Sequence, residues 1–218
     1  MQVRELGRGE ASGEIGAPGR VPPGIMEIVP RRFGDDRGSF SEVWNRAAFR
    51  EVGLERDWCQ DNQSLSRPVG TLRGLHYQLA PNAQTKLVRV LAGRILDVVV
   101  DIRPGSPTLG GWAGLEISDE VGNQVLVPSG YAHGFVTLEP DTVVLYKVDA
   151  PYSPRDDRAV RWDDPAIGLP WPLGRNGLPQ EPILSGKDAA APSLADAVAE
   201  LEALAEPEAV AEPGARGA

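Results

Sequence analysis

The chain contains a series of short strand-like segments separated by Gly, Pro, Asn and Asp turns, and this pattern restricts the fold more than any other feature. The segments cover residues 25–30, 87–91, 94–103, 112–118, 124–127, 132–138 and 142–148. In residues 94–103, Leu96, Val98, Val100 and Ile102 fall on one face, and this period of two residues is typical of a β-strand. Short strands at this spacing, separated by turn residues, predict an all-β sandwich or barrel. The 25 glycines and 20 prolines favour many turns and the same fold class.

Three local signals add detail to this prediction. Asn45 is a good N-cap for a short helix that Gly53 would end. Residues 195–206 carry leucine and valine at helical spacing, which predicts an amphipathic surface helix. The dipeptide Ala92-Gly93 predicts a tight hairpin between the two strands that flank it.

The length of 218 residues fits one domain with appendages. Residues 1–24 are rich in glycine and proline and are expected to be a flexible leader. Residues 25–195 are expected to be the folded domain. Residues 196–218 are expected to be an acidic tail, partly helical or disordered. This tail holds six acidic residues and one arginine, so it contributes much of the net charge of −9.

Several functional classes are disfavoured by composition. No apolar run approaches the roughly 20 residues that a membrane span needs, and no signal peptide is visible, so the cytoplasm is the expected compartment. A nucleic-acid surface would need a basic stripe, which is missing. The single cysteine, Cys59, excludes an internal disulfide and a cysteine-based metal cluster, and we expect it to be a buried thiol.

Residues 60–90 depart from the pattern of an ordinary core strand, whose inner face is dry. Polar side chains crowd this stretch, first at strict alternation and then as cations. They are Gln60, Asn62, Ser64, Ser66, Arg73, His76 and Lys86. The stretch therefore predicts a polar, cationic interior built on a sheet.

Both histidines of the chain, His76 and His133, lie close to glycines. A glycine near a histidine on a strand lets a ligand or another backbone come close. A β-barrel metal site typically needs two or three histidines and a carboxylate that converge. Here the two histidines are far apart in the sequence, and there is no third, so we expect no metal and no cofactor.

Acid–base chemistry suits these residues better. Removal of a proton next to a carbonyl needs a base with a pKa near 7 and a cation or donor beside the enolate oxygen. His76 with Lys86 or Arg73 supplies both. Return of the proton to the opposite face needs a second acid. Tyr146 is a candidate, although the pattern around it alone is more typical of a core aromatic residue.

Three aspartates are interpreted as structural. Asp97 and Asp101 lie on a predicted strand and are expected to pair with Arg89 or Arg103. Asp164 precedes a proline and is expected to be a turn residue.

Longer motifs follow one another in a fixed order along residues 25–195. They read Phe33-x-Asp35-x-Arg37-Gly38-x-Phe40-x-Glu42, Gln60-x-Asn62-x-Ser64-x-Ser66, Arg73-Gly74-Leu75-His76-Tyr77-Gln78, Gln84-x-Lys86-Leu87-Val88, Pro128-x-Gly130-x-Ala132-His133-Gly134-Phe135, Tyr146-Lys147 and Leu184-Ser185-x-Lys187-Asp188. Together they resemble the dTDP-4-dehydrorhamnose 3,5-epimerases, the RmlC-like branch of the cupins. The resemblance implies a jelly-roll β-barrel (a double-stranded β-helix) with a few short peripheral helices. It also implies a homodimer in which an N-terminal strand joins the partner's sheet.

The resemblance further implies a dTDP-4-keto-6-deoxy sugar as substrate, and a role for each matching residue. His76 matches the base that takes the C3 and C5 protons, with Asp188 as its dyad partner. Tyr146 matches the acid on the opposite face, and Lys86 the cation near the enolate oxygen. The residues that match substrate contacts are Arg37, Phe40, Glu42, Gln60, Asp61, Asn62, Arg73, His133, Asp157 and Lys187. Asp157 stands where many members carry glutamate, and Arg37 is expected to reach across the dimer.

The expected activity is therefore cofactor-independent 3,5-epimerisation in dTDP-L-rhamnose biosynthesis. Three alternatives stay open. The first is a 3-epimerase, which would keep the same residues and move only one centre. The second is a nucleotide-sugar-binding jelly roll without activity. The third, a metal-dependent oxygenase, would require stoichiometric iron.

Overall fold

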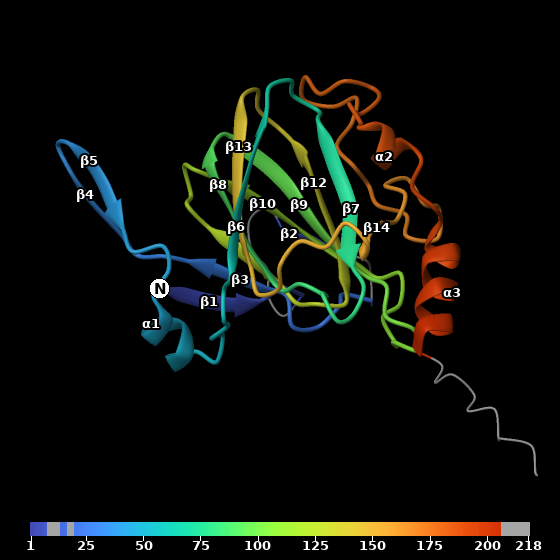
Figure 1. The fold of residues 1–218 in the computed structure, drawn as a ribbon. Helices are drawn as coiled ribbons and strands as arrows, with labels where there is room; N and C mark the ends of the chain where they lie inside the picture. The colour runs from blue at the N-terminus through green and yellow to red at the C-terminus, as the bar shows by residue number, and fades with distance from the viewer. Residues whose placement is uncertain (8–13, 17–19, 206–218) are drawn as a thin grey trace, which may run out of the picture.

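Two six-stranded antiparallel sheets pack face to face in the computed structural model, which describes residues 1–7, 14–16 and 20–205 (Figure 1). Sheet 1 has the order β1 (Gln2–Glu5), β3 (Met26–Val29), β11 (Gln124–Val127), β8 (Lys86–Ala92), β13 (Thr142–Val148) and β6 (Gln60–Ser66). Sheet 2 has the order β14 (Asp157–Ala159), β7 (Leu72–Gln78), β12 (Tyr131–Thr137), β9 (Arg94–Asp101), β10 (Trp112–Ser118) and β2 (Glu14–Gly16). The predicted all-β jelly-roll class is confirmed.

The three helices in the described part of the chain are short and peripheral, as predicted: α1 (Arg46–Glu51), α2 (Gly186–Ala189) and α3 (Leu194–Ala205). The predicted cap of α1 is present, because the Asn45 side chain accepts hydrogen bonds from the backbone N–H of Ala47 and Ala48. No helix in the described residues is both long and apolar enough to cross a membrane.

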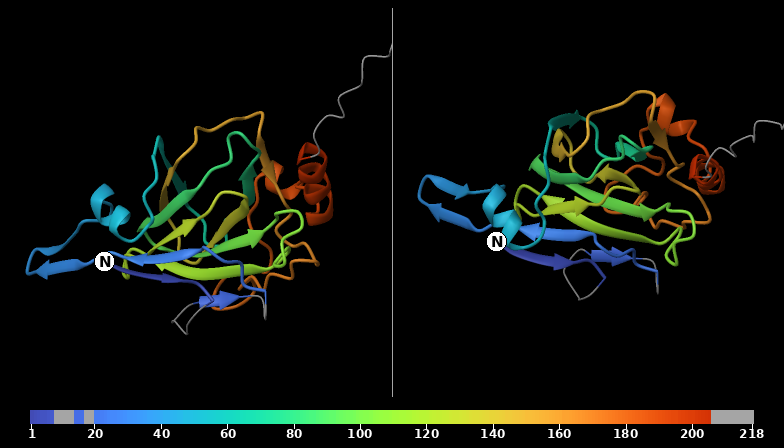
Figure 2. Two further views of the ribbon diagram at one scale, coloured as in Figure 1. Left: turned by 90° about the horizontal axis from the view of Figure 1, so that it is seen from below. Right: turned by 60° about the horizontal axis from the view of Figure 1, so that its bottom comes forward.

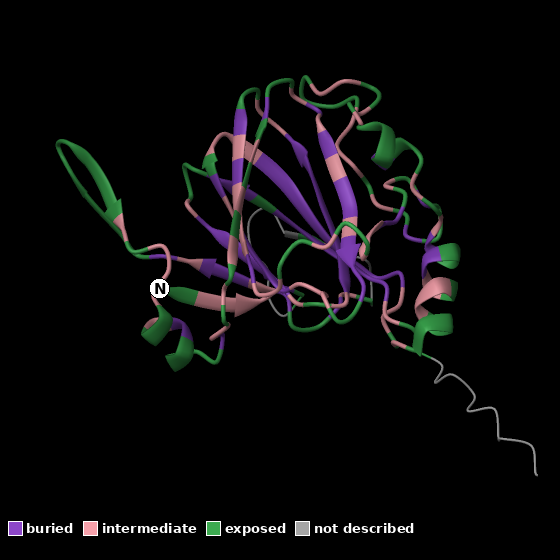
Figure 3. Ribbon diagram, in the orientation of Figure 1, coloured by how far each residue is buried: buried purple, intermediate pink, exposed green. Residues whose placement is uncertain are grey.

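Buried residues run along the strands of both sheets (Figure 3). Their apolar side chains form three layers, because successive residues of a strand point to opposite faces of the sheet. The middle layer lies between the sheets and includes Val88 from sheet 1 and Val99 from sheet 2. A second layer covers the outer face of sheet 2, where Leu75 and Val98 pack with residues of the C-terminal segment such as Leu194. Both faces of sheet 2 are therefore buried, and β9 is buried along nearly its whole length.

The third layer lies on the outer face of sheet 1. Phe49 of α1 packs there with Ile28, Leu87 and Leu126. Burial of one such side chain contributes about 1.5–3 kcal/mol relative to leaving it exposed. These outer layers hold both sheets in place, so the space between the sheets does not need to be apolar throughout.

The predicted hairpin at Ala92-Gly93 is wrong. β8 pairs with β11 and β13 in sheet 1, whereas β9 pairs with β10 and β12 in sheet 2. The chain changes sheets at Gly93, where φ is +86° and a Cβ would lie 2.5 Å from Thr142 Oγ1. Only glycine fits this corner.

Two parts of the expected leader are strands. β1 pairs with β3, with Gln2 opposite Val29, and β2 pairs with β10. The rest of the leader falls partly on residues 8–13 and 17–19, which lie outside the described residues. The predicted C-terminal helix is α3, which buries Leu194 and Ala197 against the body. The remainder of the expected tail, residues 206–218, is likewise outside the description.

A small hairpin projects from the body of the molecule. It consists of β4 (Arg32–Asp35) and β5 (Gly38–Ser41), which pair only with each other. Figures 1 and 2 show it extending away from both sheets. Its aromatic side chains have little cover, and Phe40 is 70% exposed.

Candidate active site

The polar row predicted at residues 60–66 lies on β6, at the edge of sheet 1. Burial alternates along this strand, with Gln60, Asn62 and Ser64 less exposed than the residues between them. Asn62 lies opposite Tyr146 of β13, so the row and Tyr146 share the inner face of the sheet. The row therefore lines the space between the sheets, beside the apolar middle layer.

Two residues next to this row face outward. Asp61, a predicted substrate contact, is half exposed and accepts a hydrogen bond from Lys147 Nζ at 2.9 Å. Cys59 is exposed, so the prediction of a buried thiol is wrong. Both are an odd number of residues from Asn62. Their side chains therefore point to the outer face of the sheet, whereas that of Asn62 points to the inner face.

His76 and Asp188 are in direct contact although 112 residues separate them. His76 lies on β7 and Asp188 on α2, and His76 Nε2 is 2.5 Å from Asp188 Oδ1. The side chain of Asp188 is only 4% exposed, whereas that of His76 is 33% exposed. Burial raises the pKa of Asp188, but hydrogen bonds from His76 and Ser185 outweigh it and leave that pKa below its ordinary value.

Ser185 fixes the second oxygen of the Asp188 carboxylate. Its hydroxyl donates to Asp188 Oδ2 at 2.8 Å and accepts from the Asp188 backbone N–H at 3.1 Å. It is also the N-cap of α2. The sequence motif contained Ser185, but no role was predicted for it. The available signal is a serine three residues before an acidic residue, which is an N-cap spacing.

Lys86 lies on the inner face of β8 and is buried. Its Nζ donates to the backbone carbonyl oxygen of His76 at 3.2 Å. Burial lowers the pKa of Lys86 to about 8, and the nearby carboxylates of Asp97 and Asp157 oppose that shift. The structure thus brings the predicted cation next to the predicted base.

His133 forms a second histidine–carboxylate pair. Its Nε2 is 2.8 Å from Asp97 Oδ2, and both side chains are buried. The predicted pairing of Asp97 with an arginine is wrong. His133 lies directly opposite His76 in the β12–β7 register, so the two imidazoles are neighbours on one face. Burial lowers the pKa of His133.

The other two aspartates have the structural roles that were predicted. Asp101 accepts hydrogen bonds from the Arg103 guanidinium and from the hydroxyls of Ser106 and Thr108. Asp164 accepts from the backbone N–H of Ala166 within a turn.

Tyr146 lies on β13 with its ring against the middle apolar layer. Burial raises its pKa, and the positive charge of Arg73 opposes that shift. Arg73 is held by Ser66, whose Oγ accepts from the guanidinium Nε at 3.1 Å. Tyr146 therefore lies on the inner face of sheet 1, against the middle apolar layer and with the charge of Arg73 nearby.

Hydrogen bonds tie Tyr152, in the loop after β13, and Asp157, at the start of β14, to residues of the site. Asp157 Oδ2 accepts from Lys187 Nζ at 2.5 Å and from the Tyr152 hydroxyl at 3.1 Å. The Tyr152 backbone N–H donates to Gln60 Oε1 at 3.0 Å. Tyr152 had no predicted role, because an exposed tyrosine in a proline-containing loop carries no distinctive pattern.

Two glycines allow β7 and β12 to approach each other closely. A Cβ on Gly74 would lie 2.5 Å from Gly134 Cα, and φ of Gly74 is +136°. The expectation that glycine near the histidines admits another backbone is confirmed at this point.

Three predicted substrate contacts do not join the others within one chain. Arg37 lies in the turn of the projecting hairpin and pairs with Asp35, and Phe40 lies on β5. Glu42, just after the hairpin, is exposed and accepts from the Asn45 side chain. Figure 1 shows the hairpin and α2, which carries Asp188, on opposite sides of the molecule.

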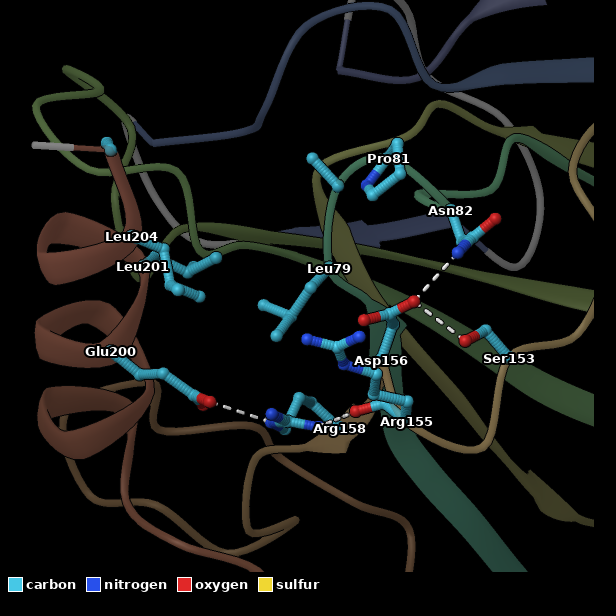
Figure 4. A pocket seen from close by; sticks show the side chains of 12 residues that line it. Leu79, Pro81, Asn82, Ser153, Arg155, Asp156, Arg158, Glu200, Leu201 and Leu204 are labelled. Carbon is cyan, nitrogen blue, oxygen red and sulfur yellow. Dashed lines mark hydrogen bonds and ion pairs between the residues drawn. The ribbon is translucent and has the colours of Figure 1, made fainter. Parts of the chain in front are cut away.

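A separate pocket of about 680 Å³ lies between α3 and the loop after β7 (Figure 4). Leu79, Leu201 and Leu204 line it, and Arg158 donates to Glu200 across one side. None of its lining residues belongs to the predicted site.

The fold defines a class of protein: a jelly roll in which a carboxylate-bound imidazole and a buried lysine lie between the two sheets. Within the described residues, no three His, Cys, Asp or Glu side chains converge to hold a metal ion. The family model for dTDP-4-dehydrorhamnose 3,5-epimerase matches residues 22–196. The chain belongs to this family of sugar-nucleotide isomerases.

Individual relatives agree with this assignment. The dTDP-4-dehydrorhamnose 3,5-epimerase of Sinorhizobium fredii is 53% identical over 172 residues, which is 79% of this chain and 86% of the relative. The crystal structure of the Bacillus anthracis enzyme of that name, with TDP and PPi bound, is 46% identical. Its TM-score is 0.73, and the match covers 78% of this chain and 93% of that one. ChmJ, a 3'-monoepimerase from Streptomyces bikiniensis in complex with dTDP-quinovose, is 34% identical with a TM-score of 0.75, covering 84% and 88%.

Proposed function

We propose that this protein is a dTDP-4-dehydrorhamnose 3,5-epimerase that inverts C3 and C5 of dTDP-4-keto-6-deoxyglucose. The contact between His76 Nε2 and Asp188 Oδ1 carries the proposal, because it prepares an imidazole to act as a base. Family membership and the relatives named as epimerases supply the substrate class. Location in the cytoplasm stays a prediction from the sequence.

The proton is taken by His76. A carboxylate can only accept hydrogen bonds, so Nε2 of the neutral imidazole carries its hydrogen toward Asp188. Nδ1 is then the free nitrogen that removes the proton from C3 or C5. The imidazolium that forms is stabilised by the Asp188 carboxylate.

The electron pair of the broken C–H bond moves to the C4 carbonyl oxygen, giving an enolate. The Lys86 ammonium is the cation that stabilises this oxygen, since it lies beside the His76 backbone. Tyr146, on the other sheet, returns a proton to the opposite face of the carbon. Exchange with solvent then resets both residues. Each inversion thus moves one proton off and one proton on, with no redox change.

Incubation with dTDP-4-keto-6-deoxyglucose in deuterated water tests the proposal. We expect solvent deuterium at both C3 and C5, detected by NMR or mass spectrometry of the product. His76→Asn is the matched control, because its amide cannot serve as the base, and it should show no incorporation. Tight binding of the sugar nucleotide without any exchange would instead indicate a non-catalytic binding protein.

A 3-epimerase is the second candidate, favoured by the similarity to the 3'-monoepimerase ChmJ. The base, its carboxylate and the acid would be the same. The deuterium experiment separates the two candidates, since label at C3 alone would identify the 3-epimerase.

We further propose a homodimer with exchange of an N-terminal strand element. The projecting β4–β5 hairpin supports this, because Phe33 and Phe40 are largely exposed on it. The hairpin that carries Arg37 lies on the opposite side of the molecule from α2, which carries Asp188 (Figure 1). A partner subunit would place this guanidinium at the diphosphate of the other site.

A further inference from the structure

Asp97 is a buried carboxylate with an incomplete set of hydrogen bonds. Asp97 is only 1% exposed, and its Oδ2 contacts His133 Nε2. Oδ1 is also buried and has no hydrogen-bond partner in the part of the chain that the structure describes. A buried charge with one neutral partner is costly unless another charge compensates it. An aspartate at this position is therefore expected to act on neighbouring groups, and two such groups are present.

The first group is His133, whose tautomer Asp97 determines. Burial disfavours the imidazolium, so the ring is neutral and one of its nitrogens must carry the single hydrogen. Because the Asp97 carboxylate only accepts, that hydrogen is on Nε2. Nδ1 of His133 is then always an acceptor, beside the neighbouring His76.

The second group is Lys86, whose positive charge Asp97 compensates. The charged groups near it are Asp97 on β9, Asp157 on β14 and Lys187 on α2, and the imidazoles of His76 and His133 lie on β7 and β12. Asp157 is already bound by Lys187. Asp97 is thus the buried negative charge left to compensate the Lys86 ammonium.

We propose that Asp97 is a positioning residue of the site, which fixes the Nε2–H tautomer of His133 and supplies the counter-charge of Lys86. Its importance for turnover rests on the proposed epimerase function. Its effects on His133 and Lys86 do not, and they can be measured without substrate.

Nitrogen NMR of the side chains tests the tautomer, because the chain has only two histidines. With ¹⁵N-labelled imidazoles and His76→Asn for assignment, we expect His133 at pH 7 to be neutral and protonated on Nε2. Asp97→Leu removes the acceptor at similar volume and should give a mixture of tautomers. A His133 protonated on Nδ1 or on both nitrogens, or unchanged in Asp97→Leu, would overturn this part of the proposal.

The same method tests the counter-charge, because the chain has only three lysines. We expect the Lys86 ammonium, assigned through Lys86→Arg, to titrate at a pH lower by at least about half a unit in Asp97→Asn, since an opposite charge nearby favours the charged form. Asp101→Asn is the matched control: it removes a buried carboxylate from the same strand, but one bound by Arg103. Equal titration of Lys86 in wild type and Asp97→Asn would refute the counter-charge.

Activity adds a separate readout. Asp97→Asn should lower the rate of epimerisation at least about tenfold while the protein stays folded, as removal of an orienting carboxylate does elsewhere. If no epimerase activity exists in the wild type, the proposed function fails, and the two NMR measurements still decide the role of Asp97.

Discussion

At the scale of single residues, the carboxylate of Asp188 has two fixed oxygens, one on His76 and one on Ser185. We expect Asp188→Asn to lower kcat about 10²- to 10⁴-fold with little change in stability, because the amide cannot hold the imidazole in one tautomer or stabilise its charge. Steady-state kinetics and thermal unfolding measure the two effects. Asp163→Asn, which removes an exposed carboxylate paired with Arg161, is the control. A rate within about threefold of wild type for Asp188→Asn would exclude an orienting role.

The pKa of Lys86 predicts the pH above which activity declines. A lysine is charged below its pKa, and the pKa of Lys86 is lowered to about 8 by burial. In the proposed mechanism, stabilisation of the enolate therefore declines as the pH rises through about 8. Tyr146 does not interfere in this range, because burial raises its pKa above the ordinary value near 10. We expect kcat/KM to fall above about pH 8 in wild type.

The matched variant is Lys86→Arg. A guanidinium keeps its charge throughout this range. Its activity will be lower because its shape differs, but the decline near pH 8 should vanish. Persistence of that decline in Lys86→Arg would assign it to another group.

The polar row at residues 60–66 could be predicted from the sequence, whereas the partner of Asp97 could not. The strict alternation at residues 60–66 could be interpreted because a polar inner face is unusual. Asp97 was misassigned because it shares its face of the predicted strand with Asp101 and Arg103, which suggested an arginine as its partner. In the structure both faces of β9 are buried. The local sequence gives no sign that the face carrying Asp97 is covered by the other sheet.

At the scale of elements, the approach of β7 to β12 sets the spacing of the two histidines. We expect Gly74→Ala to destabilise the protein by about 2–4 kcal/mol, since it combines a positive φ with a backbone clash. Urea unfolding measures this loss. Gly53→Ala is the control, because Gly53 has φ of +75° but nothing within 4 Å of its Cβ, and should cost about 1 kcal/mol. Equal losses in both variants would show that the close approach is unimportant.

Strand existence could be predicted from the sequence, but strand partners could not. The local pattern that identifies β8 and β9 as strands is the same whether they form a hairpin or belong to different sheets. At the corner between them, Gly93 lies against Thr142, which comes from a strand about fifty residues later. Such contacts between distant segments leave no mark in the local pattern.

At the scale of the whole molecule, the projecting hairpin predicts complementation between subunits. Arg37→Ala and His76→Asn should each be inactive alone. In a mixed dimer, one site would combine an intact His76 with Arg37 from the partner subunit. Random pairing of equal amounts should therefore restore about a quarter of wild-type activity, because half of the dimers carry one intact site.

The control is a mixture of Asp188→Asn with His76→Asn. These two residues meet within one chain, so each chain still carries a defective dyad and no activity should return. Sedimentation establishes the dimer independently. Absence of complementation in a proven dimer would show that Arg37 acts in its own chain or not at all.

The separation of 112 residues between His76 and Asp188 also concerns how the protein is made. Contacts between distant segments form late, because closing a long loop costs conformational entropy before the contact is gained. On the ribosome, a chain that has not yet emerged past residue 188 contains most of both sheets but cannot form the dyad. We therefore expect catalytic competence to be among the last properties that a newly synthesised molecule acquires.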